Sequence, residues 1–415
     1  MIIGIVIAVA VVGWMLIQLG VRPNLGKTAT ITVWGINDDA QLWTNLTKTY
    51  SEETGNKVVY VQKSPETYEQ ELVNALASGN GPDVFYFNNA WLIKHYRKLA
   101  PAPQSLFTPQ SVGDAYPQVV SRDFVSNGNV YAVPLYLDSL VMFYNPALLD
   151  QAAIPFPPKT WEELLTMVPK LKHVDLSGNV QIAGVALGLG SNVQHASDIL
   201  SLLMIQSGST MVDENHRPTF NDHTGQQAMT FMTQFAQLGS DAYTWNQNMD
   251  PSLEAFAKGE AAIAFGYASD IPYIRSIAPY LNYKIAPMPQ PQSATLRTDF
   301  ASYWGLAVAK QSPNADAAWQ LISAVTQTDP STTYMNTTNL PPAKRVLLQS
   351  TQGNPIFDVF NREAYTATSW PNPDPDIVDQ IFRDGIDNVA TNRMTVSDAL
   401  DAMSKQVDKV FQDTL

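Results

Sequence analysis

Short runs of β-branched and aromatic residues alternate with longer amphipathic stretches over most of the chain. Residues 30–36 (TITVWGI) alternate apolar and polar side chains, which is typical of a half-buried strand. A helical pattern follows over residues 39–53, and a second strand is predicted over residues 57–62. Further strands, separated by helical patterns, are predicted at residues 83–87, 181–187, 261–265, 283–286 and 303–309. This alternation predicts an α/β fold in which helices pack on mostly parallel sheets.

Helix-start signals support several of the helical stretches. Ser64-Pro65 places a capping residue before a proline, which is typical of the first turn of a helix. Thr160 and Glu163 have the spacing of a capping box. The tail of the chain is nearly all helical in pattern, and its last helix repeats apolar residues at three- and four-residue spacing: Val396, Ala399, Leu400, Met403, Val407, Val410 and Phe411.

Residues 1–21 form an apolar run in which Gln18 is the only strongly polar side chain. At about 1.5 Å per residue, a helix of this length spans the roughly 30 Å hydrocarbon core of a bilayer. No small-residue cleavage signal is evident after the run, so an uncleaved anchor is favoured over a removed signal peptide, with residues 22–29 as a linker. Arg22 and Lys27 follow the run, and this charge bias by itself favours a cytoplasmic body.

Composition narrows the class of protein. The length of 415 residues suits two domains better than one. A net charge of −13 argues against nucleic acid as a partner, because nucleic acid is bound by basic surfaces. The chain has no cysteine, which excludes disulfides, thiolate nucleophiles and cysteine-bound zinc.

Catalytic motifs are not evident. HExxH and GxSxG do not occur, and the five histidines show no metal-ligand spacing, so we expect neither a metal nor a cofactor. Acidic residues are numerous, and a pair of carboxylates of the glycosidase type therefore remains open.

Several motifs occur in a fixed order along the chain. The turn Gly79-Asn80-Gly81-Pro82-Asp83-Val84 has the pattern GxxPDV, and residues 130–150 read VYAVPLYLDSLVMFYNPALLD. The later segments are 157–164 (PPKTWEEL), 256–264 (FAKGEAAIA), 285–289 (IAPMP), 304–308 (WGLAV) and 339–341 (NLP). In order and spacing, this set closely resembles the extracellular solute-binding proteins of the sugar (maltose-binding) type, family 1, which are the capture subunits of ATP-driven importers.

The resemblance implies a two-lobed periplasmic-binding-protein-like fold of type II, with ligand bound between the lobes. Lobe one would comprise residues 30–137 and 288–335, and lobe two residues 138–287 and 336–415. The resemblance also implies that the body lies outside the cytoplasm, which overrules the weak charge bias of Arg22 and Lys27. It further implies an ABC permease as partner and a monomeric state. The chain departs from the commoner pattern because it has no lipid-bearing cysteine, and an N-terminal membrane helix would tether the body instead.

A sugar ring has apolar faces and a rim of hydroxyls, so its site needs aromatic plates beside planar donors and acceptors. Ligands of α/β folds lie at the carboxyl ends of strands. After the first predicted strand come Trp34, Asn37 and Asp38, for which a core tryptophan and a helix N-cap are the alternatives. After the strand 83–87 come Asn88, a second candidate for a ligand contact or a cap, and Trp91.

Asp138 is the strongest acidic candidate, because apolar strands flank it on both sides and a carboxylate there needs donors. A hinge-stabilising salt bridge is the alternative. In lobe two, the candidates are Asn192 after a predicted strand, and Gly266 with Tyr267 where relatives carry an aromatic plate. The resemblance also places an aromatic side chain beside the cleft at Tyr303 and Trp304, with a core role for Trp304 as the alternative.

The sequence therefore predicts the binding subunit of an importer for a mono- to oligosaccharide, which clamps an unaltered ligand by closure of two lobes. Two alternatives remain. The same fold would also serve a polyamine, a peptide or a phosphorylated polyol, and Asp38, Asp39 and Asp138 would suit a polyamine. The other alternative is a surface glycoside-processing enzyme.

Overall fold

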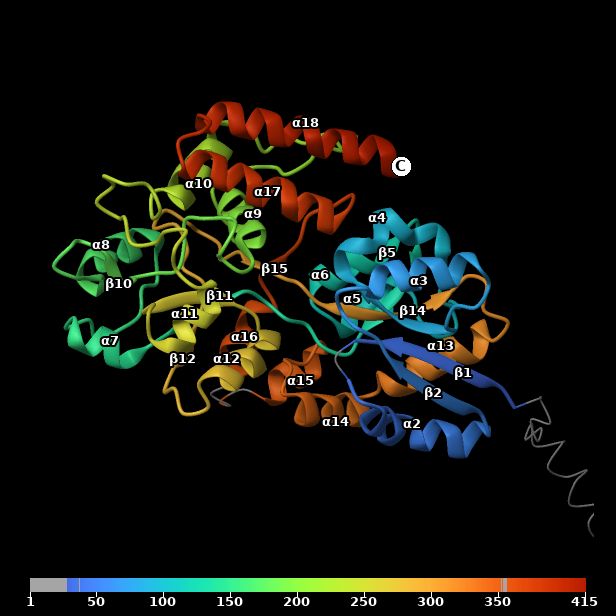
Figure 1. Cartoon of the computed structure of the whole chain (residues 1–415). Coiled ribbons are helices and arrows are strands. Elements are labelled where there is room, and N and C mark those ends of the chain that lie inside the picture. Colours follow the sequence, from blue (N-terminus) through green and yellow to red (C-terminus); the bar gives the residue numbers. More distant parts are fainter. Residues whose placement is uncertain (1–27, 37, 352, 354–356) are drawn as a thin grey trace, which may run out of the picture.

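The computed structural model describes residues 28–36, 38–351, 353 and 357–415. The predicted membrane segment 1–21 and the candidate Asn37 lie outside the described residues. Within the described ranges, no helix is both long and apolar enough to cross a bilayer. The described chain folds into two α/β lobes that lie side by side, with the N-terminal strands in one lobe and the helices α7–α12 in the other (Figure 1).

Lobe one is built on a six-stranded sheet with the order β2-β1-β3-β14-β4, and β7 pairs with β14. β1 is parallel to β2 and β3, whereas β14 is antiparallel to β3, β4 and β7. The strands are β1 (Thr30–Gly35), β2 (Lys57–Gln62), β3 (Val84–Asn88), β4 (Leu99–Ala100), β7 (Ala132–Pro134) and β14 (Trp304–Ala309). The predicted strands at the start of the chain and at residues 303–309 are therefore confirmed to within about one residue.

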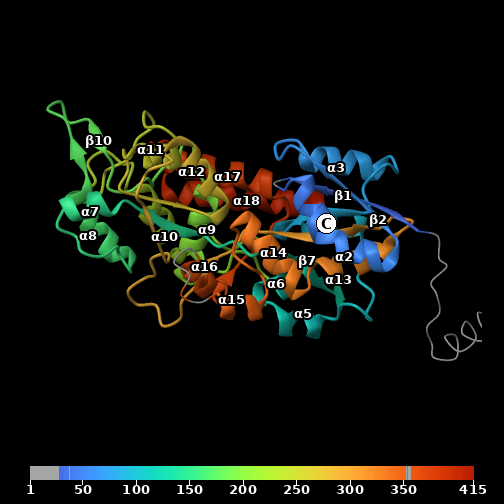
Figure 2. The same ribbon diagram turned by 90° about the horizontal axis from the view of Figure 1, so that it is seen from below.

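Helices cover this sheet on both faces (Figure 2). The first begins after Asp39, whose carboxylate accepts from the N–H of Leu42 at 2.7 Å, and it ends at Gly55, which has a φ of 72°. The helices of lobe one are α2 (Ala40–Thr54), α3 (Tyr68–Ala77), η1 (Asn89–Trp91), α4 (Leu92–His95), η2 (Tyr96–Lys98), α5 (Pro109–Ala115), α6 (Gln118–Phe124), α13 (Ala315–Val325) and α14 (Thr328–Thr338). A hairpin of β5 (Val125–Ser126) and β6 (Asn129–Val130) follows α6.

Both sheets correct the prediction of mostly parallel sheets, because in lobe one the three pairings of β14 are antiparallel and only the two pairings of β1 are parallel. The sheet of lobe two consists of β8 (Val141–Tyr144), β11 (Ile263–Gly266) and β12 (Lys284–Ala286), and both neighbours are antiparallel to the central β8. The reason lies in the chain path, because β8 enters the lobe from the crossing segments while β12 leads back to them. Two strands that traverse a lobe in opposite directions cannot pair in parallel.

The predicted strand over residues 181–187 is much shorter than expected. Only β10 (Val180–Ile182) is a strand, paired with β9 (His173–Val174), and Ala183 adds an isolated bridge to Ala261. The helices of lobe two are α7 (Pro146–Gln151), α8 (Trp161–Leu171), α9 (Ala196–Gln206), α10 (His223–Thr233), α11 (Ser252–Lys258), η3 (Ala268–Asp270), α12 (Ile271–Ile277), α17 (Pro375–Ala390) and α18 (Val396–Thr414).

Helix α18 fulfils the prediction of a docked amphipathic helix. Ala399, Leu400, Met403, Val407 and Phe411 are buried along one face of it. It packs against α17 and α10, and its C-terminal end extends across toward α4 of lobe one (Figure 1).

The segments that cross between the lobes are tied together near their middle. Ser139 and Tyr136 form bridges to Ala301 and Pro342, and β13 (Asp299–Phe300) pairs with β15 (Ala367–Thr368). The connecting helices are α15 (Arg345–Ser350) and α16 (Phe357–Glu363).

Charged side chains are buried beside these crossing segments. Arg297 Nη2 lies 2.7 Å from Asp299 Oδ1 and 2.7 Å from Glu363 Oε1, and both carboxylate side chains are fully buried. Glu363 Oε1 also accepts from the backbone N–H of Met288 at 2.7 Å. Burial raises the pKa of both acids, while the guanidinium opposes that rise. The crossing region is therefore held by buried charge as well as by backbone pairing.

Candidate functional site

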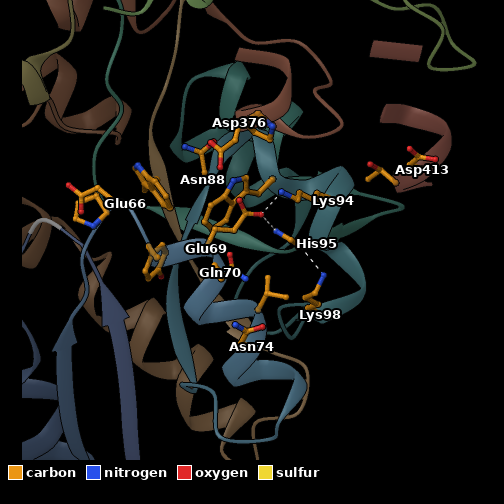
Figure 3. A pocket seen from close by; sticks show the side chains of 17 residues that line it. Glu66, Glu69, Gln70, Asn74, Asn88, Lys94, His95, Lys98, Asp376 and Asp413 are labelled. Atoms are coloured by element: carbon orange, nitrogen blue, oxygen red, sulfur yellow. Dashed lines mark hydrogen bonds and ion pairs between the residues drawn. The ribbon is translucent and has the colours of Figure 1, made fainter. Parts of the chain in front are cut away.

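A cavity of about 710 Å³ lies between the lobes (Figure 3). Its lobe-one wall comes from α3, from the segment η1–α4, and from the adjoining ends of β3 and β14. The lobe-two wall comes from Pro375 and Asp376 at the start of α17 and from Asp413 and Thr414 at the end of α18. The cavity therefore draws on both lobes and forms at the strand ends where α/β folds bind ligands.

Three aromatic side chains form the apolar part of the wall. Trp304 meets Trp91 edge-on at a centroid distance of 5.0 Å and Tyr68 at 5.8 Å, and Tyr68 stacks on Trp91 at 6.1 Å. The hydroxyl of Tyr68 donates to the backbone oxygen of Tyr86 at 2.9 Å, which fixes the ring. Trp91 and Tyr68 are buried, whereas Trp304 is half-buried. Trp304 is thus the indole best placed to offer a face to a ligand.

Asn88 lies directly opposite Trp304 in the sheet. The two are paired residues of β3 and β14 at the cleft edge, where β3 ends and β14 begins. The Asn88 Oδ1 atom accepts from the N–H of Ala90 at 2.9 Å and so caps η1. Its Nδ2 group makes no hydrogen bond to the part of the chain that the structure describes, and it stands beside the indole as a donor.

A chain of charged and polar groups runs along the same wall (Figure 3). Lys98 Nζ lies 2.9 Å from His95 Nδ1, His95 Nε2 lies 2.5 Å from Glu69 Oε1, and Lys94 Nζ lies 2.7 Å from the same oxygen. Burial lowers the pKa of His95, so its ring is neutral at pH 7 and donates from Nε2 to Glu69. Burial alone would raise the pKa of Glu69, but the bonds from His95 and Lys94 outweigh it and hold that pKa at about 2.

Two further acidic side chains, Glu66 and Asp376, line the cavity. Glu66 is exposed, and a hydrogen bond from Ser64 lowers its pKa. Asp376 approaches from lobe two, and its pKa is raised by partial burial and then by the neighbouring Glu69 charge. The cavity thus combines an aromatic face with carboxylate, amide and ammonium groups at its rim. This arrangement suits a polar ligand with an apolar face.

Within residues 28–36, 38–351, 353 and 357–415, no group of three or more His, Asp or Glu side chains is arranged to hold a metal ion.

Three of the sequence-predicted site residues, Asn88, Trp91 and Trp304, line the cavity together. Trp34 and Asp38 do not. The ring of Trp34 is covered by Lys63, whose Nζ lies 3.9 Å from the ring centroid. Asp38 is buried and accepts from Trp43 Nε1 at 3.2 Å and from two tyrosine hydroxyls, those of Tyr86 and Tyr334. Burial raises the pKa of Asp38 despite these bonds.

Asp138 is buried outside the cavity, with both carboxylate oxygens occupied. Oδ1 accepts from the N–H groups of Ala268 at 2.9 Å and Ser139 at 3.0 Å, and Oδ2 accepts from the N–H of Ser269 at 2.9 Å. The expected need for donors is therefore met by the first turn of η3 instead of by ligand hydroxyls or a salt bridge. Burial is the main reason why the pKa of Asp138 rises to about 7.

The lobe-two candidates are also engaged in internal contacts. Asn192 accepts from Trp245 Nε1 at 2.8 Å and donates to two backbone oxygens at 3.0 Å. The hydroxyl of Tyr267 donates to Asp198 at 2.7 Å, and its ring meets that of His195 at 4.7 Å. A Cβ added to Gly266 would lie 2.7 Å from Asp270 Oδ2, so glycine lets that carboxylate approach the backbone.

Tyr303 belongs to the core and not to the cleft. Its side chain is fully buried against Phe124, at a centroid distance of 5.5 Å, and its hydroxyl donates to Asp123 Oδ2 at 2.8 Å. Tyr303 is the residue just before β14 and Trp304 is its first residue, and neighbouring residues at the start of a strand point to opposite sides. Trp304 therefore faces the cavity while Tyr303 faces the interior.

Sequence reasoning missed most of the polar wall. Glu69 and Lys94 come from α3 and α4, where a charged residue is ordinarily a solvated one, so no pattern distinguished them. Asp376 follows Pro375, the first residue of α17, and this proline is the only local signal.

Two α/β lobes, crossing segments between them and a cavity with an aromatic wall and a polar rim define a solute-binding protein of the hinged, two-lobed class. The chain belongs to the bacterial extracellular solute-binding protein family, whose model matches residues 35–330. The resemblance noted in the sequence motifs is thereby confirmed.

Curated relatives match parts of the chain. A probable ABC transporter-binding protein of Deinococcus radiodurans is 27% identical over 187 residues, which cover 43% of each chain. The diacetylchitobiose-binding protein DasA of Streptomyces coelicolor is 28% identical over 138 residues, or 32% of each chain. The chain thus spans less than half the length of these relatives.

Solved structures share the fold over nearly the whole chain. A cyclo/maltodextrin-binding protein complexed with maltotetraose has a TM-score of 0.78 at 19% identity, covering 93% of this chain and 98% of that one. A solute-binding protein of Thermotoga lettingae bound with α-D-tagatose has a TM-score of 0.75 at 22% identity, covering 92% of this chain and 100% of that one. At these identities the likeness establishes the two-lobed fold alone.

Proposed function

We propose that this protein is the substrate-binding subunit of an ATP-binding-cassette importer and captures a carbohydrate between its lobes. The observation that carries the proposal is the pairing of Trp304 with Asn88 at the cleft edge. An indole face suits the C–H face of a sugar ring, and the adjacent amide suits a ring hydroxyl. The diacetylchitobiose-binding relative and the structures holding maltotetraose and tagatose support the carbohydrate class.

The mechanism is closure around an unaltered ligand. Each lobe supplies part of the cavity wall, so only the closed state brings both sets of side chains to the ligand. In this proposal the moving bodies are residues 30–137 with 288–335 and residues 138–287 with 336–415. The buried charges at Arg297 and the bridges of the crossing segments form the pivot.

The body acts outside the cytoplasm, in keeping with the extracellular family to which the chain belongs. The apolar segment 1–21 tethers it to the membrane, so that a captured ligand stays near the permease. The closed protein then docks on the permease and releases the ligand without bond chemistry.

A thermal-shift screen of the purified protein against saccharides and polyamines tests the ligand class. A carbohydrate at 100 times its dissociation constant should add about 2.7 kcal/mol to the free energy of unfolding. The Trp304→Ala variant should lose most of that shift. Tyr280→Ala is the matched control, since Tyr280 is an aromatic residue with 97% exposure that does not line the cavity. Stabilisation by polyamines alone would refute the carbohydrate assignment, and turnover of a glycan would favour an enzyme.

A further inference from the structure

One lysine joins the cavity wall of lobe one to lobe two. Lys94 Nζ lies 2.7 Å from Glu69 Oε1 in lobe one and 2.7 Å from Asp374 Oδ2 at the start of α17 in lobe two. The side chains of Lys94, Glu69 and Asp374 are 23%, 17% and 11% exposed, so the three charges are largely withdrawn from water. Figure 3 shows the Lys94 side chain on the cavity wall, reaching toward Glu69.

Both ends of this bridge are held in place by other contacts. Glu69 is fixed by His95 at 2.5 Å, and His95 in turn by Lys98 at 2.9 Å. Asp374 caps α17 through the N–H of Ile377 at 3.4 Å. Because each carboxylate has a second partner besides Lys94, the ammonium group meets a preorganised pair of acceptors when the lobes approach.

The bridge lies away from the pivot. The hydrogen bonds of Arg122 with Thr368 and of Asp123 with Ser369 connect the lobes next to the crossing strands. On the α17–α18 side, Lys94 is joined by Arg97, whose Nη2 donates to the Leu415 carbonyl at 3.2 Å. A contact far from a hinge opens early in the rotation, so it acts on the balance between open and closed states.

We propose that Lys94 is a positioning residue that sets the open–closed balance of the lobes through its ion pair with Asp374. The proposal rests on the hinge closure described under the proposed function. Because ligand affinity scales with the fraction of binding-competent protein, the same contact tunes affinity for whatever the cleft holds. Asp374 does not line the cavity, so its influence on affinity cannot come from touching the ligand.

The interlobe distance is the direct readout. The chain has no cysteine, so Ala77→Cys with Lys405→Cys gives a single pair of spin-labelling sites, on exposed positions of α3 and α18. In the full-length protein without carbohydrate, Lys94→Met and Asp374→Asn should each raise the ratio of open to closed states roughly tenfold, as expected for a charge-assisted hydrogen bond. Asparagine retains the helix cap, so Asp374→Asn isolates the ion pair.

Two controls keep the test decisive. Lys63→Met removes a lysine whose 2.8 Å pair with Glu71 lies within lobe one, and it should leave the distances unchanged. The double variant Lys94→Met/Asp374→Asn should open the protein no more than either single variant, because both substitutions remove the same interlobe ion pair between Lys94 and Asp374. Unchanged distances in Lys94→Met, or additive effects in the double variant, would overturn the proposal.

Ligand binding is measured separately on the same variants. Asp374→Asn should weaken the affinity for a carbohydrate identified by thermal shift and speed its dissociation. If the distances respond but no carbohydrate binds, the carbohydrate assignment fails and the bridge stands. If carbohydrate binds equally well to all variants and the distances do not move, the bridge fails and the carbohydrate assignment stands.

Discussion

The carboxylate of Asp138 accepts a hydrogen bond from the backbone N–H of Ser269 at 2.9 Å. These two residues are far apart in the chain, and their contact ties the segment that leaves lobe one to the first turn of η3. Helix starts carry unpaired N–H groups and favour negative charge nearby. Burial nevertheless dominates, which is why the pKa of this acid rises to about 7.

The Asp138→Asn variant should change how stability depends on pH. Because the folded pKa of about 7 exceeds the ordinary aspartate pKa of 3.8, the folded state binds the extra proton between these values. The contribution of Asp138 to stability is therefore full below about pH 4 and is lost as the pH rises toward 7. Calorimetric melting temperatures from pH 4 to pH 8 should fall less steeply in the variant than in the original protein. Parallel curves would contradict this expectation.

His195 should act on stability in a higher pH window. Burial alone would lower its pKa, but Asp270 outweighs burial and raises it to about 8, with 2.8 Å between Nε2 and Oδ2. Its contribution is full below about pH 6.5 and is lost as the pH rises through 8. His195 has a φ of 58°, so His195→Asn is the variant with least backbone strain. This variant should flatten the melting curve between pH 6.5 and 9, and an unchanged slope there would contradict the assignment.

Arg297→Met should be strongly destabilising. The substitution leaves the fully buried carboxylates of Asp299 and Glu363 without their cation. Breaking a buried ion pair from one side costs about 3–5 kcal/mol, which denaturant unfolding would detect. Arg362→Met is the control, because Arg362 pairs with Asp358 at the surface and should cost less than about 1 kcal/mol. Similar losses in the two variants would show that burial does not decide the effect.

Asn88→Asp should separate ligand binding from stability. A carboxylate still accepts from the N–H of Ala90, so the cap on η1 persists. The Nδ2 donor is lost, and affinity for a carbohydrate that uses it should fall roughly tenfold. Isothermal calorimetry measures the affinity, and the melting temperature without ligand serves as the internal control. Unchanged affinity would remove Asn88 from the contacts.

Sequence patterns were sufficient for most elements and for part of the cavity. Alternation and capping located β1, α2, β2, α8 and α18, because those signals are local. The rule that ligands gather at the carboxyl ends of strands found Asn88, whereas the family resemblance found Trp304, and the structure pairs the two residues across β3 and β14.

The remaining features depend on contacts between distant parts of the chain. The need of Asp138 for donors was inferred correctly, yet no pattern indicated that the backbone of residues 268–269 would supply them. Likewise, Lys94 and Asp374 look like ordinary surface charges until the lobes meet. The antiparallel sheet of lobe two was missed because strand direction follows from the path between lobes, which local periodicity does not encode.

The position of β14 has a consequence for biosynthesis. In the sheet, this strand lies between β3 and β4. In the sequence, however, all three strands of the lobe-two sheet (β8, β11 and β12) come between β3 and β14. As the chain emerges from the ribosome, the sheet of lobe two is complete once residue 286 is available, whereas that of lobe one must await residues 304–309. The N-terminal strands therefore spend much of translation with an unpaired edge, a state that invites aggregation and chaperone capture. The pairing that brings Trp304 to Asn88 therefore becomes possible only after the sheet of lobe two can form.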